Sequence, residues 1–131
     1  MRIVPRQNSD SPSLGIDLVE VERIARLAHN ERFLNRIFTH AELADCRKRL
    51  FPERALAARF AAKEATAKAL GTGIGKELGW KEIELTTDNE KRPSIRLHGK
   101  WAEEPLHISV SVTHTRTTAA AVVAIFPEDN S

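Results

Sequence analysis

The sequence is poor in cysteine and aromatic residues and contains no tyrosine. Cys46 is the only cysteine in 131 residues, so no disulfide can form within the chain, which agrees with a reducing cytoplasm. Aromatic residues make up 5% of the chain, so its core must be mainly aliphatic. No apolar run approaches the ~18 residues of a membrane span, and the first residues lack a signal peptide's apolar segment. We therefore expect a cytoplasmic protein that does not enter a membrane.

The composition is that of one globular domain rather than of a disordered segment. Hydrophobic residues make up 41% and charged residues 29% of the chain, whose length is enough for a single self-standing core. Residues 1–13 are polar and contain two prolines. We expect a flexible extension over 1–13, followed by one domain over 14–131.

The positive charge is concentrated in the middle of the chain. Net charge is only +2, yet seven basic and two acidic residues lie between Arg47 and Lys68. This segment indicates either an anionic partner, such as phosphate, an acidic protein or nucleic acid, or simply a solvated helix face. The basic residues do not alternate with aromatic residues that could stack on bases, which argues against binding of single-stranded nucleic acid.

Two helices carry clear boundary signals. Thr39 and Glu42 form a capping box, so we expect a helix over 41–50. Pro52 suits the first turn of the next helix, and Gly71 suits a left-handed cap at its end. The residues on one face of this long helix are apolar except for one lysine: Leu56, Phe60, Lys63, Ala67 and Leu70.

Strand periodicity appears before and after these helices. Apolar residues alternate over 14–18, and alternation returns at 83–85, 95–97 and 108–112. The last segment, "AAAVVAIF", is continuously apolar, so we expect a strand buried on both faces. The order of strand, helices, long helix and meander predicts an α+β fold, with an antiparallel sheet packed against one long helix and shorter helices.

Glu64 and Lys68 are four residues apart and share one face of the long helix. The simplest interpretation is a surface ion pair of little energetic value. However, Glu64 follows Phe60 by one turn, so it borders the apolar stripe. Its carboxylate is well placed there to hold a metal ion against a groove, while Lys68 contacts an anion beside it.

Asp17, the segment "GTGIG" and His114 each admit a structural and a functional interpretation. Asp17 lies inside the apolar strand "LGIDLVEV" and needs a partner there, whether an arginine, a backbone cap or a metal ion. "GTGIG" follows a helix and is a weak phosphate-binding signal, although glycines let a backbone approach a ligand closely. His114 lies where a strand gives way to a turn, and a lone histidine there is more often structural. No second histidine or cysteine stands at ligand spacing, so zinc is not expected.

Taken together and in this order, several segments resemble the holo-[acyl-carrier-protein] synthases, the short type of 4′-phosphopantetheinyl transferase. The similarity covers about residues 14–126. It is carried by "GIDLVEVERI", "FLNRIFTHAEL", "RFAAKEATAKALGTGIG", a tryptophan followed by "IEL", and "ISVSVTH" before a final apolar strand. The first and third segments are the most specific. The resemblance implies the 4′-phosphopantetheinyl transferase fold and a homotrimer with sites between subunits.

The resemblance also implies a reaction. These enzymes move the phosphopantetheine arm of coenzyme A to a serine of an apo acyl carrier protein and release adenosine 3′,5′-bisphosphate. Asp17 and Glu64 match the family's Mg²⁺-binding acids, and oxygen ligands suit this hard ion. Lys68 matches the lysine that stabilises the leaving phosphate. Either Glu64 or a metal-bound water would take the proton of the serine, and the sequence leaves both open.

Further residues are assigned by the same resemblance to substrate contacts. Arg59, Gly71 and His114 match positions that line the coenzyme A site, beside Lys68. The resemblance implies that His114 comes from a neighbouring subunit. The glycines of "GTGIG" would let the chain pass beside this ligand.

The carrier protein is expected to meet the first helices. Arg23 matches the family's first-helix arginine that contacts the acidic carrier, and Arg26 and Arg32 could assist it. The chain departs from the family pattern at Ser13, where a glycine is usual, and at Thr113, where a serine is common. Neither departure removes a proposed metal or phosphate ligand.

Three alternatives remain open from the sequence. The same chemistry could serve a specialised polyketide-type carrier. A non-catalytic coenzyme A or nucleotide-binding module could keep the fold, although Asp17, Glu64 and Lys68 are all present. A small basic nucleic-acid-binding domain would show affinity that falls steeply with salt and needs no Mg²⁺.

Overall fold

A computed structural model of the chain describes residues 11–128. Its elements, in chain order, are β1 (Ser13–Glu20), α1 (Val21–Leu27), α2 (Glu31–Ile37), α3 (His40–Arg47), α4 (Pro52–Leu70), the 3₁₀ turn η1 (Trp80–Glu82), β2 (Ile83–Thr87), β3 (Pro93–Leu97), the 3₁₀ turn η2 (Gly99–Trp101), β4 (Leu106–His114) and β5 (Thr118–Pro127). The strand β1 begins at Ser13, one residue before the expected start of the domain, and most of the expected extension lies outside the described residues.

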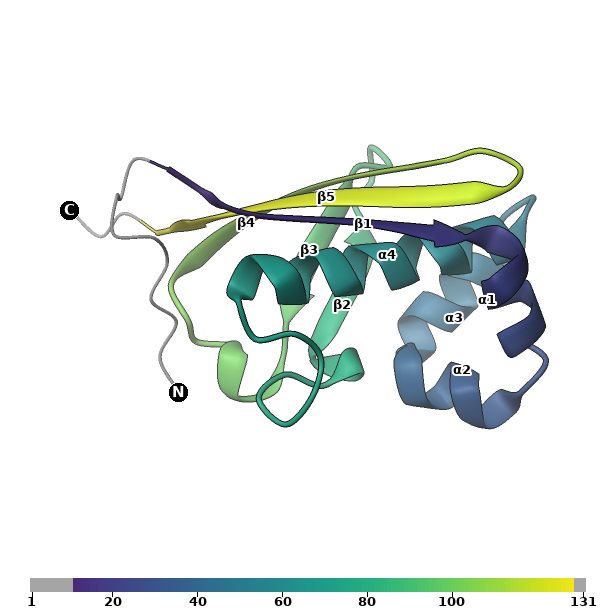
Figure 1. Cartoon of the computed structure of the whole chain (residues 1–131), viewed down its shortest axis with the longest axis horizontal. Coiled ribbons are helices and arrows are strands. Elements are labelled where there is room, and N and C mark those ends of the chain that lie inside the picture. The colour runs from purple at the N-terminus through teal and green to yellow at the C-terminus, as the bar shows by residue number, and fades with distance from the viewer. Residues whose placement is uncertain (1–10, 129–131) are drawn as a thin grey trace.

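The strands of the described residues form two antiparallel sheets. β5 is the central strand of a three-stranded sheet with the order β1-β5-β4, and β2 pairs with β3 in a two-stranded sheet. Helix α4 lies along the three-stranded sheet, with α1–α3 gathered at one end of the molecule (Figure 1). The α+β class with an antiparallel sheet on one long helix is confirmed, although the expected single sheet is divided in two.

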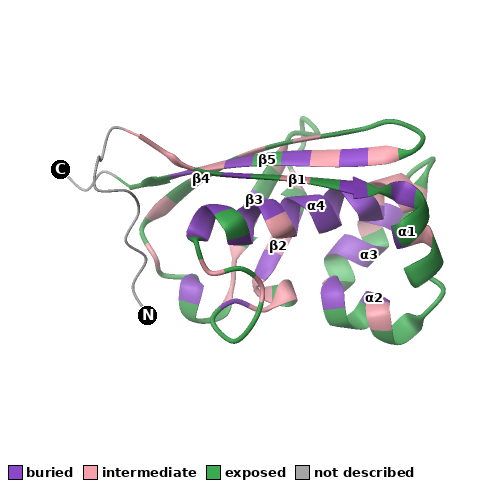
Figure 2. Cartoon of the chain, viewed as in Figure 1, coloured by how far each residue is buried: buried purple, intermediate pink, exposed green. Residues whose placement is uncertain are grey.

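Helix α4 has the ends that the sequence predicts. Pro52 is its first residue, and Gly71 caps it with a left-handed φ of 81°. Its alanines are small enough for other elements to approach the helix on several sides, and most of the helix is buried in Figure 2. The helix therefore forms the centre of the core.

Strand β1 crosses α4 at Gly15, where the two backbones almost touch. A Cβ atom built on Gly15 would lie 1.9 Å from the carbonyl oxygen of Ala65 and 2.8 Å from the amide nitrogen of Ala69. The hydroxyl of Ser13 donates a hydrogen bond to the carbonyl oxygen of Ala69, which fastens the start of the strand to the end of the helix. Only glycine permits this approach, and it brings the next residues of β1 beside α4.

We expect Gly15→Ala to lower the free energy of unfolding by about 1–3 kcal/mol or more, because the added methyl group must push strand and helix apart. Urea unfolding of the purified protein measures this change. Gly75→Ala is the matched control, since a Cβ there meets no atom within 4 Å. Equal stability of the two variants would show that the strand can move away from the helix without cost.

The outer face of the three-stranded sheet is apolar and uncovered in the single chain. Leu14, Ile16 and Leu18 of β1 are 62%, 68% and 71% exposed, and Val122 and Phe126 of β5 are exposed on the same face. The expectation that β5 is buried on both faces is therefore wrong for the single chain. The core covers only the face that includes Ala119, Ala121, Val123 and Ile125.

Helix α3 is joined to α4 by a buried ion pair. The expected capping box between Thr39 and Glu42 is present, and the helix ends at Arg47 rather than near residue 50. Lys63, the exception in the apolar stripe, is fully buried, and its Nζ lies 2.8 Å from Oε1 of Glu42. Lys63 also donates to the carbonyl oxygens of Trp80 and Ile83, so one ammonium group connects α4, α3, η1 and β2.

No helix among the described residues combines the length and the apolar character that crossing a membrane requires.

Candidate active site

Three charged side chains meet where β1 passes over the second half of α4. The Nζ of Lys68 donates to Oδ1 of Asp17 at 3.1 Å and to the carbonyl oxygen of Ile16 at 3.0 Å. Asp17 is 17% exposed in its side chain, whereas Lys68 is 53% exposed. The partner that Asp17 needs is thus a lysine in this structure, and the Asp17 side chain is half-buried rather than enclosed in the core.

Glu64 belongs to the same cluster, one turn before Lys68. Burial raises the pKa of Glu64, the nearby carboxylate of Asp17 raises it further, and the charges of Lys68 and Arg23 oppose this rise. Two carboxylates that repel each other at one place stabilise an added cation. The cluster of Asp17, Glu64 and Lys68 is therefore suited to a divalent ion and a phosphate together.

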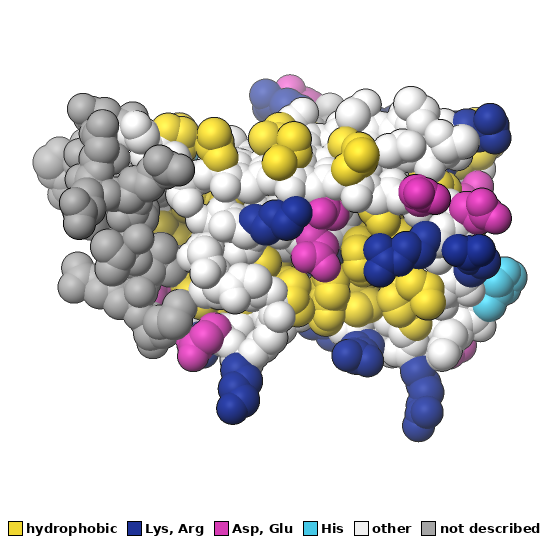
Figure 3. Space-filling model, in the orientation of Figure 1, with side chains coloured by type: hydrophobic (Ala, Val, Ile, Leu, Met, Phe, Trp, Pro, Cys, Tyr) yellow, Lys and Arg dark blue, Asp and Glu magenta, His cyan; other side chains and the backbone are white. Residues whose placement is uncertain are grey.

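A shallow hollow opens beside this cluster. It has a volume of about 460 Å³ and is lined by Ile16, Asp17, Leu18, Lys68 and Ala120. On the face shown in Figure 3, acidic side chains lie between basic ones and beside a hydrophobic patch. Nearby, the Phe60 ring stacks on Trp80 with the ring centroids 4.9 Å apart, and the Arg23 guanidinium carbon lies 5.7 Å from the centroid of Phe60.

A metal ion at this cluster would have two protein carboxylate ligands. Within residues 11–128, no three His, Cys, Asp or Glu side chains gather in a group that could hold a metal ion. An ion bound by Asp17 and Glu64 would therefore take its other ligands from water or from a substrate. Mg²⁺ commonly binds through one or two carboxylates together with substrate phosphates and water, so these residues fit it.

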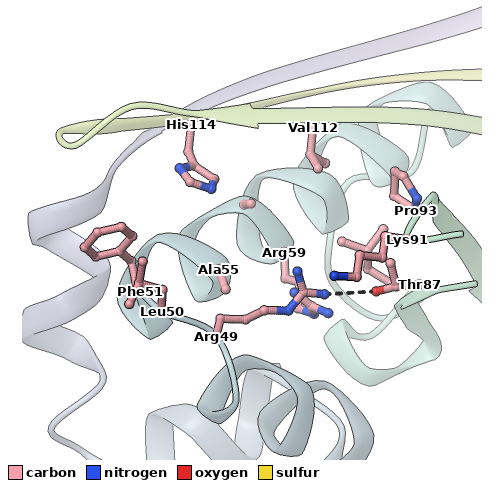
Figure 4. Close-up of a pocket in the computed structure, with 12 residues that line it drawn as sticks. Arg49, Leu50, Phe51, Ala55, Arg59, Thr87, Lys91, Pro93, Val112 and His114 are labelled. Carbon is pink, nitrogen blue, oxygen red and sulfur yellow. Dashed lines mark hydrogen bonds between the residues drawn. The ribbon is translucent and has the colours of Figure 1, made fainter. Parts of the chain in front are cut away.

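A second hollow, of about 290 Å³, lies between α4, the α3–α4 loop, the β2–β3 hairpin and the end of β4 (Figure 4). Four of its lining residues are basic or can become so: Arg49, Arg59, Lys91 and His114. The others are mostly apolar and include Leu50, Phe51, Pro93 and Val112. We call this the anion hollow, because its basic side chains converge on a partly apolar space that suits a nucleotide.

Arg59 is the buried member of the anion hollow. It is only 4% exposed, and its Nη2 donates to Oδ2 of Asp45. Its Nε is buried with no hydrogen-bond partner among the described residues. A buried guanidinium nitrogen without a partner is costly, and an anionic ligand in the hollow can relieve that cost.

The structure divides the predicted coenzyme A residues between two places. Lys68 lies with Asp17 and Glu64, while Arg59 and His114 line the anion hollow of the same chain. Gly71 ends α4, roughly 18 Å along the helix axis from Arg59. Because Arg59 and His114 line the same hollow, a site that receives His114 from one subunit also receives Arg59 from that subunit.

The predicted carrier-binding arginines lie on the first helices. Arg23 and Arg26 are exposed on α1, and Arg32 is exposed in the first turn of α2. Arg23 also acts on the pKa of Glu64, so it lies close to the carboxylate cluster. The carrier surface expected from these arginines would thus adjoin the cluster.

Sequence reasoning did not single out Arg49, Phe51 or Lys91 as site residues. Arg49 was counted only within the basic segment, and Lys91 stands in the β2–β3 turn with a positive φ of 63°. For Arg49, the available signal was the excess of basic residues between Arg47 and Lys68, a segment that begins just before α4 and continues through most of it. Nothing in its spacing showed which of its basic side chains turn toward Arg59.

The fold and the carboxylate cluster place the chain in a class of transferases. The family model described as the 4′-phosphopantetheinyl transferase superfamily matches residues 13–125, nearly all of the part that the structure describes.

Relatives narrow the class further. The holo-[acyl-carrier-protein] synthase of Chlamydia felis is 46% identical over 114 residues, which cover 83% of this chain and 92% of that protein. That of Chlorobaculum parvum is 38% identical over 116 residues, 87% of this chain and 97% of that protein. The chain belongs to the holo-[acyl-carrier-protein] synthase family of this superfamily, which confirms the resemblance noted in the sequence.

Solved structures agree with this assignment. A Bacillus anthracis holo-[acyl-carrier-protein] synthase in complex with coenzyme A (3′,5′-ADP) superimposes with a TM-score of 0.77 at 31% identity, covering 88% of this chain and 96% of that one. The Helicobacter pylori enzyme in complex with coenzyme A gives a TM-score of 0.77 at 32% identity, covering 86% and 98%.

Proposed function

We propose that this protein transfers the 4′-phosphopantetheine arm of coenzyme A to a serine of an apo acyl carrier protein. The products are the holo carrier protein and adenosine 3′,5′-bisphosphate. The observation that carries this proposal is the cluster of Asp17, Glu64 and Lys68 at the contact of β1 with α4. It gathers the acidic and basic groups that the cleavage of a diphosphate requires.

In this reaction, the serine oxygen bonds to the phosphorus that carries the pantetheine arm. The bond from that phosphorus to the bridging oxygen breaks, and the electron pair leaves with adenosine 3′,5′-bisphosphate. Mg²⁺ held by Asp17 and Glu64 would supply charge neutralisation on the diphosphate. Lys68, an exposed ammonium group beside Asp17, is placed to stabilise the leaving phosphate oxygen.

The proton of the serine needs an acceptor. Burial and the charge of Asp17 raise the pKa of Glu64, which makes its carboxylate a stronger base than an ordinary glutamate. A Mg²⁺ ion on the same carboxylate would lower that pKa again, so either Glu64 or a water on the ion would accept the proton. Asp17, which is paired with Lys68, is better suited to binding than to proton transfer.

The anion hollow would hold the adenosine end of coenzyme A. The diphosphate is assigned to the carboxylate cluster, so the anionic group that remains is the 3′-phosphate. Arg49, Arg59, Lys91 and His114 supply positive charge for it, and the apolar wall that includes Phe51 can contact the adenine.

A homotrimer with sites between subunits would bring the two places together. Arg59 and Glu64 are five residues apart on α4 and point about 140° away from each other around the helix. One ligand can reach both kinds of site most directly if they belong to neighbouring subunits. The exposed apolar residues Leu14, Ile16 and Leu18 support self-association, because a stripe of this kind marks an interaction surface.

The carrier protein would bind across α1 and α2. Acyl carrier proteins are expected to present acidic surfaces, and Arg23, Arg26 and Arg32 are exposed on these two helices. Arg23 connects that surface to the cluster through its proximity to Glu64.

The absence of an apolar membrane-spanning segment from the sequence fits a cytoplasmic site of action, which we propose as well.

Mass measurement of the carrier tests the proposal. The protein, coenzyme A and Mg²⁺ are incubated with an apo carrier of the fatty-acid type and, separately, with one of the polyketide type. We expect the fatty-acid carrier to gain the mass of the phosphopantetheine arm, and chelation of divalent ions to prevent this gain. A carrier whose acceptor serine is replaced by alanine is the control. No gain on either carrier would reject the proposed reaction.

A further inference from the structure

We propose that Asp45 is a positioning residue for the anion hollow, where it aims Arg49 and Arg59 at the 3′-phosphate of coenzyme A. This inference rests on the proposed function, because that function supplies the ligand. Asp45 lies on α3 and belongs neither to the carboxylate cluster nor to the lining of the anion hollow.

Both guanidinium groups donate to the same oxygen atom of Asp45. The Nη2 of Arg49 lies 2.9 Å from Oδ2, and the Nη2 of Arg59 donates to that oxygen as well. Arg49 has a second acceptor in the hydroxyl of Thr87, at 3.2 Å. The single carboxylate oxygen Oδ2 therefore brings together two like charges that would otherwise separate, and the same Nη2 of Arg49 also donates to the hydroxyl of Thr87.

The carboxylate of Asp45 is not among the groups that line the anion hollow itself. Asp45 lines a smaller hollow of about 180 Å³ together with Arg59 and Thr87, and His114 is not among the residues that line it. Figure 4 shows Arg49 and Arg59 side by side, with Lys91 and His114 around the same space. Asp45 can thus orient the two arginines without occupying the place of a phosphate.

The charge state of Asp45 agrees with this arrangement. Burial alone would raise its pKa, but the hydrogen bond from Arg49 and the charges of Arg59 and Arg49 together hold the pKa below the usual value. Asp45 is consequently ionised at neutral pH. Arg49, with a side chain 40% exposed, is the member that gains most from being held, since a free arginine would sample many rotamers in solvent.

Calorimetric titration with adenosine 3′,5′-bisphosphate and with adenosine 5′-monophosphate tests the inference. The two nucleotides differ in the 3′-phosphate alone. We expect Asp45→Ala to weaken binding of the bisphosphate about tenfold, the loss of one charge-assisted contact, and to change that of the monophosphate less than about twofold. Asp45→Asn keeps an oxygen acceptor, so its affinity for the bisphosphate should lie between that of Asp45→Ala and that of the parent protein.

Steady-state kinetics provide the second measurement. With Asp45→Ala, KM for coenzyme A should rise by a similar factor while kcat stays within about twofold, because the carboxylate cluster is untouched. KM for 3′-dephospho-coenzyme A, which lacks the 3′-phosphate, should not rise. Glu103→Ala, which removes an exposed acid after η2, is the control and should change neither constant.

Three results would overturn the inference. If Asp45→Ala lost the same affinity for both nucleotides, its effect would be a general structural one. If Asp45→Ala bound the bisphosphate more tightly than the parent protein does, Asp45 would be a competitor of the phosphate. Equal affinity of the parent protein for the two nucleotides would show that no 3′-phosphate site exists. Failure of the proposed function is distinct from all three, since it would leave the carrier mass unchanged while the titrations still report on Asp45.

Discussion

Glu64→Gln is expected to lower kcat by at least about a hundredfold, because a neutral amide neither binds a divalent ion as a carboxylate does nor accepts the proton of the serine. The mass assay at saturating coenzyme A and Mg²⁺ measures this loss. Glu53→Gln is the matched control, since it makes the same change roughly 16 Å away along the axis of α4. Parental turnover by Glu64→Gln at limiting Mg²⁺ would contradict the assignment of Glu64.

The same substitution should not destabilise the fold. The pKa of Glu64 is raised in the folded state, so the folded protein holds this proton more tightly than the unfolded chain does. Above the ordinary carboxyl pKa of 4.5, the ionised group therefore lowers stability, and the cost grows as the pH rises through the shifted pKa. Glu64→Gln removes that cost at neutral pH.

Thermal unfolding should then give Glu64→Gln a midpoint equal to or above that of the parent protein at pH 7, with the difference disappearing below pH 4.5. A lowered midpoint at pH 7 would show that the carboxylate is already compensated in the free protein. A variant that loses activity but keeps or gains stability is expected when the replaced group serves function rather than stability.

The local pattern of the sequence predicted the ends of α4, but it did not identify which carboxylate pairs with Lys68. Spacing alone favours an ion pair between Glu64 and Lys68 along the helix. Among the described residues, Lys68 instead pairs with Asp17, 51 positions away. That pairing depends on the close passage of β1 over α4 at Gly15, a tertiary contact that no helical spacing can reveal.

Alternation in β1 predicted a strand without showing which face is covered. Leu14, Ile16 and Leu18 have the character of core residues, yet they face away from α4, and Asp17 lies on the side of the helix. A period of two gives two faces and leaves their assignment to the packing partner. The role that we propose for Asp17 came from the resemblance to a family, not from the alternation.

The ion-pair partner of Lys63 in the core could not be predicted from the sequence either. The sequence marked it as the single exception in an apolar stripe, but its partner Glu42 belongs to another helix, 21 residues earlier. Glu42 is held in turn by its capping box with Thr39 and by the amide of Leu85, which donates to its Oε2 at 2.9 Å. A buried lysine predicts that some acid must be near, while only the packing of α3 against α4 identifies which one.

Lys63→Met is expected to lower the free energy of unfolding by about 3–5 kcal/mol, because it leaves the carboxylate of Glu42 buried without its counter-charge. Urea unfolding measures the change. Lys76→Met changes an exposed lysine directly after the segment "GTGIG"; it is the matched control and should stay within about 0.5 kcal/mol of the parent protein. A loss below about 1 kcal/mol would mean that water or a proton reaches Glu42 when the lysine is absent.

The double variant Lys63→Met with Glu42→Gln separates the cost of an unpaired charge from the worth of the pair. Glutamine is neutral and can still accept a hydrogen bond from the amide of Thr39 or Leu85, so most of the lost stability should return. Lys63 and Glu64 are adjacent and point about 100° apart on α4, so whatever fixes the rotation of the helix at Lys63 also aims Glu64. If the double variant regains stability but not turnover, the buried ion pair sets the direction of Glu64 toward Asp17 as well as holding α3 to α4.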